Sequence, residues 1–285
     1  MAPRSRPRRL RTGPGDDPPG RPGHDPPHWF RQGHGEPVVV LPGLSFSHEA
    51  PSGATRLFES ALVLGLSRRV EVHWLGRRPG VPEGHSLADF ATDCAEAIRA
   101  RFDRAAPVVG FSTGGLLGLQ LVLDHPEVVD RLVVVGAGAR LSDSARASDR
   151  AWISALEQGR TADAWAALAA DLTDDAAATG AVARVLGVVG PWVTPRDCTD
   201  GIRTARAEVD VDLTARLHEV NVRTLLVVGG RDPNVGVDLA TRTRAAIPGG
   251  QLLVLPGVGH LGSMVHPRTT DRISRFLAAG GTSGG

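Results

Sequence analysis

The stretch Pro107-Val108-Val109-Gly110-Phe111-Ser112-Thr113-Gly114-Gly115-Leu116-Leu117 decides the fold. It opens with a short apolar run that predicts a buried strand, and it runs on to Leu123 with the character of a helix. Between the two, a serine is flanked at two residues' distance on each side by glycine, which is the layout of a nucleophile elbow. The turn is so sharp that strand and helix nearly touch, so only glycine fits at Gly110 and Gly114. We expect this backbone to lift Ser112 above the sheet edge, at a helix N-terminus that favours developing negative charge.

Segments typical of strands and helices alternate on both sides of this motif. Apolar runs predict strands at residues 38–41, 70–74, 132–135, 225–228 and 252–255. Helical periodicity predicts helices at residues 55–66, 87–103, 238–247 and 269–277. Continuous apolar strands separated by amphipathic helices indicate an α/β fold, with a mostly parallel, doubly wound sheet covered by helices on both faces.

The alternation stops between residues 141 and 218, which are rich in alanine and predict three or four helices. Trp152 and Trp165 mark one-sided faces there, and the run 181–193 is too apolar for a solvated surface. A helical insertion between two strands predicts a cap over the site, and a helical subdomain that serves only stability is the alternative. We therefore expect a core at residues 34–140 and 219–280 and a cap at residues 141–218.

Both ends of the chain differ from this pattern. Residues 1–33 are rich in proline and arginine and poor in aliphatic side chains, which predicts a disordered basic tail. This tail could contact acidic partners, but a solvated tail is the preferred interpretation. Arg8-Arg9 is not followed by an apolar segment, so we expect no export signal. Residues 281–285 predict a second loose end.

Composition excludes several classes of function. The 285 residues carry a formal net charge of +1, which gives no field for nucleic acid or a membrane surface, and no apolar run is long enough to span a membrane. Cys94 and Cys198 form no disulfide framework, so we expect free thiols and a cytoplasmic location. All 32 basic residues are arginine and tyrosine is absent, which excludes a lysine Schiff base and a tyrosine proton donor.

Two further residues complete a set with Ser112. Asp232 follows the predicted strand 225–228, and His260 follows the predicted strand 252–255. Loops after parallel strands converge at one edge of a sheet, so we predict a nucleophile, an orienting acid and a general base in the order Ser112, Asp232, His260. An aspartate before proline can instead cap a helix, and a histidine in a glycine-rich loop can be structural.

Attack by the serine on a carbonyl creates an oxyanion, which requires two donors that are already aimed at it. The backbone N–H of Thr113, directly after the nucleophile, is the first candidate. The loop Pro42-Gly43-Leu44-Ser45, after the first buried strand, offers the N–H of Leu44 as the second. We predict no metal at this site.

The chain resembles the α/β-hydrolase superfamily, in the branch with a helical cap inserted after the strand that follows the elbow helix. The resemblance covers about residues 35–279. Its carriers are Leu41-Pro42-Gly43, Gly110 to Gly115, His125-Pro126-Glu127 with the strand 132–135, Gly229 to Pro233, and Leu255 to His260. The elbow is similar to that of cofactor-free haloperoxidases and aryl esterases. After the first buried strand, Pro42 stands where many members have histidine. Directly before the nucleophile, Phe111 stands where many members have a second histidine.

The resemblance implies a serine hydrolase that needs no cofactor and cleaves a small carboxylic ester or thioester, with an apolar part, through an acyl-enzyme. Acyl transfer, cyclisation or perhydrolysis by the same three residues stays open. A ligand-binding receptor on a hydrolase scaffold also stays open. That alternative predicts the loss of one of the three catalytic residues, and all three are present here. An epoxide hydrolase or dehalogenase would want a carboxylate in place of Ser112. The substrate and the oligomeric state do not follow from the sequence.

Overall fold

One seven-stranded sheet forms the centre of the molecule. The computed structural model describes residues 27–169 and 176–279. In chain order the strands are β1 (Trp29–Gln32), β2 (Pro37–Leu41), β3 (Glu71–Leu75), β4 (Ala106–Phe111), β5 (Val129–Val135), β6 (Arg223–Gly229) and β7 (Gln251–Leu255). They lie in the order β1-β3-β2-β4-β5-β6-β7. β1 pairs antiparallel with β3, whereas β2 to β7 pair in parallel. The predicted α/β fold with a mostly parallel sheet is confirmed.

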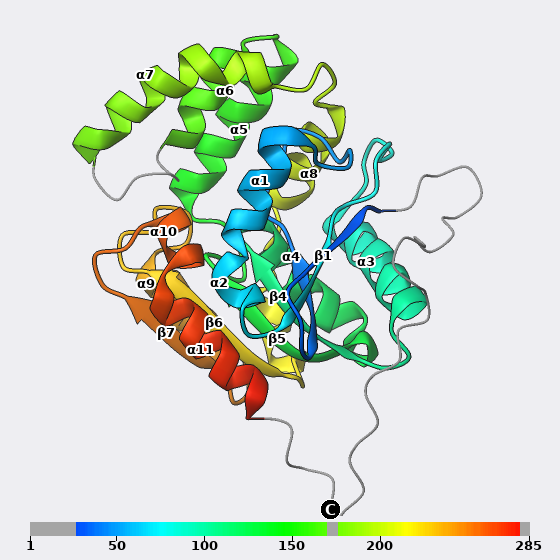
Figure 1. The fold of residues 1–285 in the computed structure, drawn as a ribbon. Helices are drawn as coiled ribbons and strands as arrows, with labels where there is room; N and C mark the ends of the chain where they lie inside the picture. Colours follow the sequence, from blue (N-terminus) through cyan, green and yellow to red (C-terminus); the bar gives the residue numbers. More distant parts are fainter. Residues whose placement is uncertain (1–26, 170–175, 280–285) are drawn as a thin grey trace, which may run out of the picture.

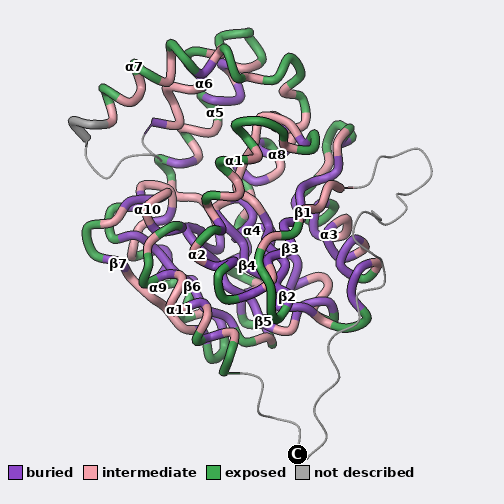
Figure 2. The backbone as a smooth tube through the Cα atoms, in the orientation of Figure 1, coloured by how far each residue is buried: buried purple, intermediate pink, exposed green. Residues whose placement is uncertain are grey.

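The central strands are buried on both faces, which explains their unbroken apolar sequences. In β4, Val108 packs into the core on one side of the sheet and Val109 into the core on the other. Val134 and Val133 of β5 alternate in the same way. Figure 2 shows the strands as mostly buried backbone inside a more exposed shell. Side chains on either face of these strands therefore pack in an apolar core.

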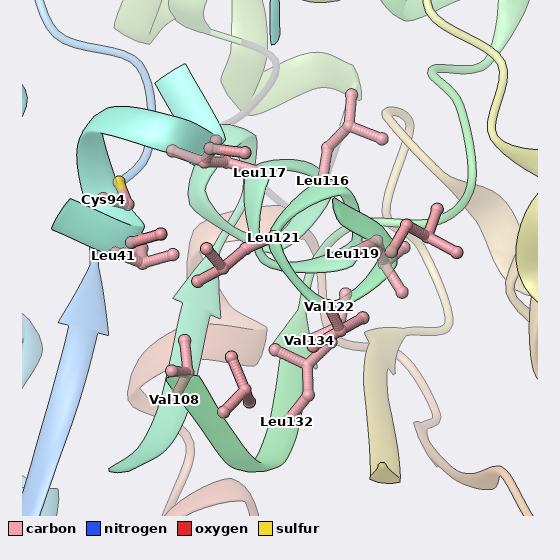
Figure 3. Packing of buried hydrophobic residues seen from close by; sticks show 14 of the residues in the cluster. Leu41, Cys94, Val108, Leu116, Leu117, Leu119, Leu121, Val122, Leu132 and Val134 are labelled. Carbon is pink, nitrogen blue, oxygen red and sulfur yellow. The ribbon is translucent and has the colours of Figure 1, made fainter. Parts of the chain in front are cut away.

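Helices cover both faces of the sheet (Figure 1). Buried residues of α3 (Leu87–Arg101) and α4 (Thr113–Asp124) pack on one face, where the partly buried Ala246 at the end of α9 (Gly236–Ala246) joins them. In Figure 3 the leucines of α4 lie against Leu41, Val108 and Leu132 of the sheet. The other face is covered by α1 (Gly53–Leu62), α2 (Leu64–Ser67), α10 (His260–Val265) and α11 (Pro267–Ala278). Short 3₁₀ turns follow at Pro126–Val128 and Thr214–Glu219.

The predicted tail differs from the structure at its end. Residues 1–26 lie outside the described residues, but β1 belongs to the sheet although the sequence places it within the tail. Phe30 stacks on Trp74 of β3 with ring centroids 5.2 Å apart, and Trp29 packs edge-on against Phe102. Two aromatic side chains thus provide the apolar surface that the rest of residues 1–33 lacks.

Among the described residues, four α-helices lie between β5 and β6, within the predicted insertion: α5 (Asp143–Glu157), α6 (Thr161–Ala167), α7 (Ala176–Val193) and α8 (Thr199–Val209). Trp152 and Ala164 belong to a separate apolar cluster that also includes Phe46 from the loop after β2. In Figure 1, α5, α6 and α7 stand above the sheet, and α8 lies between them and the core. We call α5 to α8 the cap.

The apolar sequence of α7 does not produce a buried helix. The large apolar side chains on its outer face are exposed by half or more: Val185, Val188, Val189, Trp192 and Val193. The expectation that residues 181–193 are too apolar for a solvated surface is therefore wrong for these five. The helix packs on α6 with one face only, and Trp165 lies against Gly190 there. Within residues 27–169 and 176–279, no helix combines the length and hydropathy that a bilayer crossing requires.

Candidate active site

Ser112 stands between β4 and α4 in a strained backbone conformation. Its φ of 51° and ψ of −123° make it the one non-glycine residue with positive φ in the described part of the chain. A Cβ added at Gly110 would lie 2.1 Å from the carbonyl oxygen of Gly114. A Cβ added at Gly114 would lie 2.2 Å from the carbonyl oxygen of Leu41. Side chains are excluded at both positions, so the elbow depends on the two glycines.

The structure brings Ser112, His260 and Asp232 together at one edge of the sheet. His260 Nε2 lies 3.0 Å from Ser112 Oγ, and His260 Nδ1 lies 2.9 Å from Asp232 Oδ2. In the tautomer with its proton on Nδ1, His260 donates to the aspartate, and its Nε2 accepts from the serine hydroxyl. The side chains of His260 and Asp232 are almost fully buried. This arrangement can remove a proton from the serine during attack on a carbonyl.

Local structure holds the histidine and the aspartate in place. The backbone N–H of Asn234 donates to Asp232 Oδ1 at 2.9 Å. Sequence reasoning places His260 in a loop, whereas in the structure it is the first residue of α10. Gly136, directly after β5, leaves room for the pair, since a Cβ there would lie 3.0 Å from His260 Cε1. Sequence analysis missed Gly136; its signal is a glycine immediately after a buried apolar run.

The loop after β2 lies beside the serine. A Cβ added at Gly43 would lie 3.3 Å from Ser112 Cβ. The guanidinium of Arg77, which is 5% exposed, donates to the carbonyl oxygens of Pro42 at 2.8 Å and Gly43 at 3.0 Å. Arg77 therefore fixes the loop that contains Leu44. Nothing in the sequence around Arg77 distinguishes it from a surface arginine.

A buried carboxyl group contacts the residue after the serine. The hydroxyl of Thr113 donates to Glu208 Oε1 of α8 at 2.9 Å, and Glu208 is 2% exposed. Burial raises the pKa of Glu208 to about 8, and the nearby Asp149 acts in the same direction. Sequence reasoning missed this glutamate because an acidic residue in a cap helix is typical of a solvated face.

The roles predicted for the N–H groups of Leu44 and Thr113 concern a reaction intermediate and stay predictions. Both residues border the serine region: Thr113 follows it in the chain, and Leu44 follows Gly43 and packs on the cap cluster. Within the described residues, no group of three or more His, Cys, Asp or Glu side chains could hold a metal ion.

Comparison with known proteins places the chain among hydrolases. A model of the "Alpha/beta hydrolase family" matches residues 38–273. A Klebsiella pneumoniae protein named as a carbamate hydrolase, RutD, is 28% identical over 68% of this chain and 74% of its own length. The pimeloyl-[acyl-carrier protein] methyl ester esterase of Neisseria meningitidis is 25% identical over 69% of this chain and 80% of its own length. A shorter match, 41% identical, spans 25% of the Serratia proteamaculans RutD and 23% of this chain.

Solved structures share the fold. An esterase from Thermogutta terrifontis has a TM-score of 0.66 at 18% identity, covering 89% of this chain and 93% of its own. A Mycobacterium tuberculosis protein named as the non-heme bromoperoxidase BpoC has a TM-score of 0.67 at 22% identity, covering 90% of this chain and 98% of its own. The family model extends from β2 into α11, across the whole sheet except β1. The chain therefore belongs to the α/β-hydrolase family.

Proposed function

We propose that the protein is a serine hydrolase that cleaves a small carboxylic ester or thioester through an acyl-enzyme on Ser112. The observation that carries this proposal is the pair of hydrogen bonds from His260, one with Ser112 Oγ at 3.0 Å and one with Asp232 Oδ2 at 2.9 Å. A serine, a base and an orienting acid in this relation are the requirements for nucleophilic acyl transfer.

The first half of the reaction forms the acyl-enzyme. His260 Nε2 takes the proton of the Ser112 hydroxyl while Oγ attacks the substrate carbonyl carbon. The N–H groups of Leu44 and Thr113 stabilise the negative carbonyl oxygen of the tetrahedral intermediate. The protonated histidine then gives its proton to the departing alcohol or thiol, and the carbonyl re-forms. Asp232 holds the imidazole in the required tautomer and stabilises its charged form.

The second half of the reaction uses water. His260 takes a proton from a water molecule, whose oxygen attacks the acyl carbon, and then returns the proton to Ser112 Oγ as the acid departs. A different acceptor in place of water would give acyl transfer or cyclisation, and hydrogen peroxide would give a peracid. The named activities of the Neisseria and Klebsiella relatives support hydrolysis, since both are hydrolases acting at a carbonyl group.

Replacement of the nucleophile tests the proposal. We expect Ser112→Ala to lower kcat by at least about a thousandfold, because the attacking oxygen is lost. The measurement is hydrolysis of p-nitrophenyl esters of increasing chain length, and of an acyl thioester, by the full-length chain. A fluorophosphonate probe should label the wild-type protein and leave S112A unlabelled.

A second serine provides the control. Ser274→Ala, on α11 where the hydroxyl only donates to the carbonyl of Thr270, should keep both hydrolysis and labelling. Hydrolysis by S112A at a rate near that of the wild type would contradict the proposal. A wild-type chain that neither hydrolyses these substrates nor reacts with the probe would favour a ligand-binding receptor instead. Product analysis with added alcohol or peroxide separates hydrolysis from acyl transfer and perhydrolysis.

A further inference from the structure

One face of α8 carries three polar side chains that bind the core. Asp200, Thr204 and Glu208 follow one another at intervals of four residues, so they share a helix face. The carboxylate of Asp200 accepts from the backbone N–H groups of Gly80 at 3.0 Å and Val81 at 2.9 Å. We call these three residues the α8 polar row.

The second member of the row contacts the loop after β2. Thr204 Oγ1 lies 2.9 Å from His48 Nε2, and His48 Nδ1 lies 2.8 Å from the carbonyl oxygen of Arg78. A carbonyl only accepts, so Nδ1 carries the proton and Nε2 is an acceptor for the threonine hydroxyl, which also lies 2.9 Å from the carbonyl oxygen of Asp200. This bond joins the cap to the same loop that includes Leu44.

The third member reaches the elbow itself. Glu208 Oε1 accepts from the hydroxyl of Thr113, while Oε2 is inaccessible to solvent and has no hydrogen-bond partner among the described residues. An ionised carboxylate in this position would leave a buried charge only partly compensated, which costs far more than a buried neutral carboxyl group. Burial therefore favours the protonated form of Glu208, whereas the hydrogen bond from Thr113 favours the ionised form and lowers the pKa.

Two other charged groups influence this carboxyl group. Asp149 of α5 opposes its ionisation, and Arg77, in the loop after β3, favours it. The hydrogen bonds of Arg77 go to the carbonyl oxygens of Pro42 and Gly43. Burial has the largest effect, and the balance raises the pKa of Glu208 to about 8.

We propose that Glu208 is a positioning residue, which fixes Thr113 for oxyanion binding and does so productively only while it carries its proton. The inference rests on the proposed function, because the N–H of Thr113 matters only if Ser112 forms a tetrahedral intermediate. Loss of the proton places a negative charge behind the residue that must stabilise a second one. Like charges in a water-poor site repel strongly, so deprotonation should slow the chemical step while leaving substrate binding largely intact.

The pH dependence of kcat tests this inference. In the wild-type enzyme we expect kcat for a p-nitrophenyl ester to fall at least about fivefold between pH 7 and pH 9.5, with KM changing less than about twofold. In Glu208→Gln, which is neutral at every pH, this alkaline fall should disappear. Rates are corrected for spontaneous hydrolysis, and melting curves at each pH establish that the proteins are folded.

A matched variant separates positioning from anchoring of the helix. Asp200→Asn changes the same polar row but contacts Gly80 and Val81 instead of the elbow, so its alkaline fall should remain. If E208Q does not fold, Glu208→Met supplies a neutral side chain of similar length and should also lack the fall. Thr113→Val removes the hydroxyl and keeps the N–H, and we expect it to lower kcat at least about threefold with little change in KM.

The outcomes distinguish this inference from the proposed function. An active wild-type enzyme that is labelled at Ser112, but shares its alkaline profile with E208Q, would overturn the role of Glu208 alone. The same holds if wild-type kcat does not fall between pH 7 and pH 9.5, or if D200N loses the fall as E208Q does. Ester hydrolysis by the S112A variant at a rate near that of the wild type would overturn the proposed function itself, and with it the inference about Glu208.

Discussion

Ser112 combines a reactive position with a backbone strain that its neighbours must support. Its positive φ persists because β4 and α4 are both buried and allow the turn no alternative path. Gly110 and Gly114 sit so close to other backbone atoms that any side chain would separate the strand from the helix. The strain is thus maintained by the best-packed part of the molecule.

Gly110→Ala tests this account. We expect a loss of about 3 kcal/mol or more in the free energy of unfolding, or failure to fold, because the new Cβ would lie 2.1 Å from a backbone oxygen. Urea unfolding followed by circular dichroism measures the change. Gly180→Ala in α7 is the control: apart from the neighbouring backbone of its own helix, no described atom lies within 4 Å of the added Cβ, and we expect a gain of about 0.5 to 1 kcal/mol. Wild-type stability of G110A would refute the argument.

Residues in the short segments that follow a strand could be found in the sequence, because the strand itself fixes where these segments begin. Ser112, Asp232 and His260 were predicted in this way, and the structure brings their side chains together. Arg77 and Glu208 could not be found, because Arg77 bonds to a loop that follows a different strand and Glu208 depends on how the cap packs on the core. No local pattern marks a charged side chain that becomes buried by contacts more than ninety residues away in the chain, as the Thr113–Glu208 bond is.

At the scale of elements, α8 depends on a histidine that must stay neutral. Burial lowers the pKa of His48 to about 3, with Arg77 acting in the same direction, from an ordinary value of 6.5. The unfolded chain therefore binds a proton that the folded chain does not between about pH 6.5 and pH 3. Where the unfolded state binds more protons than the folded state, the free energy of unfolding decreases as the pH decreases. Acid therefore destabilises the fold as the pH drops below 6.5.

His48→Gln should flatten this dependence. Glutamine retains hydrogen-bonding groups but does not titrate, so we expect H48Q to be less stable at pH 7 yet to lose stability more slowly with acid. The difference in slope should approach about 1 kcal/mol per pH unit between pH 6 and pH 4.5. Urea unfolding at several pH values measures it, with the exposed His218→Gln as the control. Parallel slopes for wild type and H48Q would contradict the assignment.

Elements with long apolar runs were predictable, including the edge strand β7, whereas short elements without such a run were not. The apolar runs in β2, β4, β5 and β6 are long because these central strands face two cores. β1 was missed because an edge strand of four residues has half-exposed side chains and no such run. α10 was missed because six residues after Gly259 are too few for a periodic pattern. The outward face of α7 was misjudged because apolar content alone does not reveal how many sides of a helix are covered.

In the molecule as a whole, α7 is less covered by neighbouring elements than the sheet-covering helix α4 is. It packs on α6 with one face and exposes an apolar row on the other, whereas α4 is buried along nearly its whole length. We expect amide hydrogens in residues 180–193 to exchange at least about a hundredfold faster than those of β4 and β5. Hydrogen–deuterium exchange with mass spectrometry measures this difference. Equal protection of α7 and the central strands would show that the cap and the sheet open as one unit.

The α8 polar row also sets the limits within which this protein can be recombined. A chimera that exchanges residues 143–193 replaces helices that contact one another and Phe46, and that meet α8 through the ion pairs Arg150–Asp210 and Glu157–Arg206. A chimera that exchanges α8 as well would remove the hydrogen-bond partners of His48, Val81 and Thr113 together. A chimera should therefore join the two parents between α7 and α8. By its contacts, the last cap helix has to come from the same parent as the core.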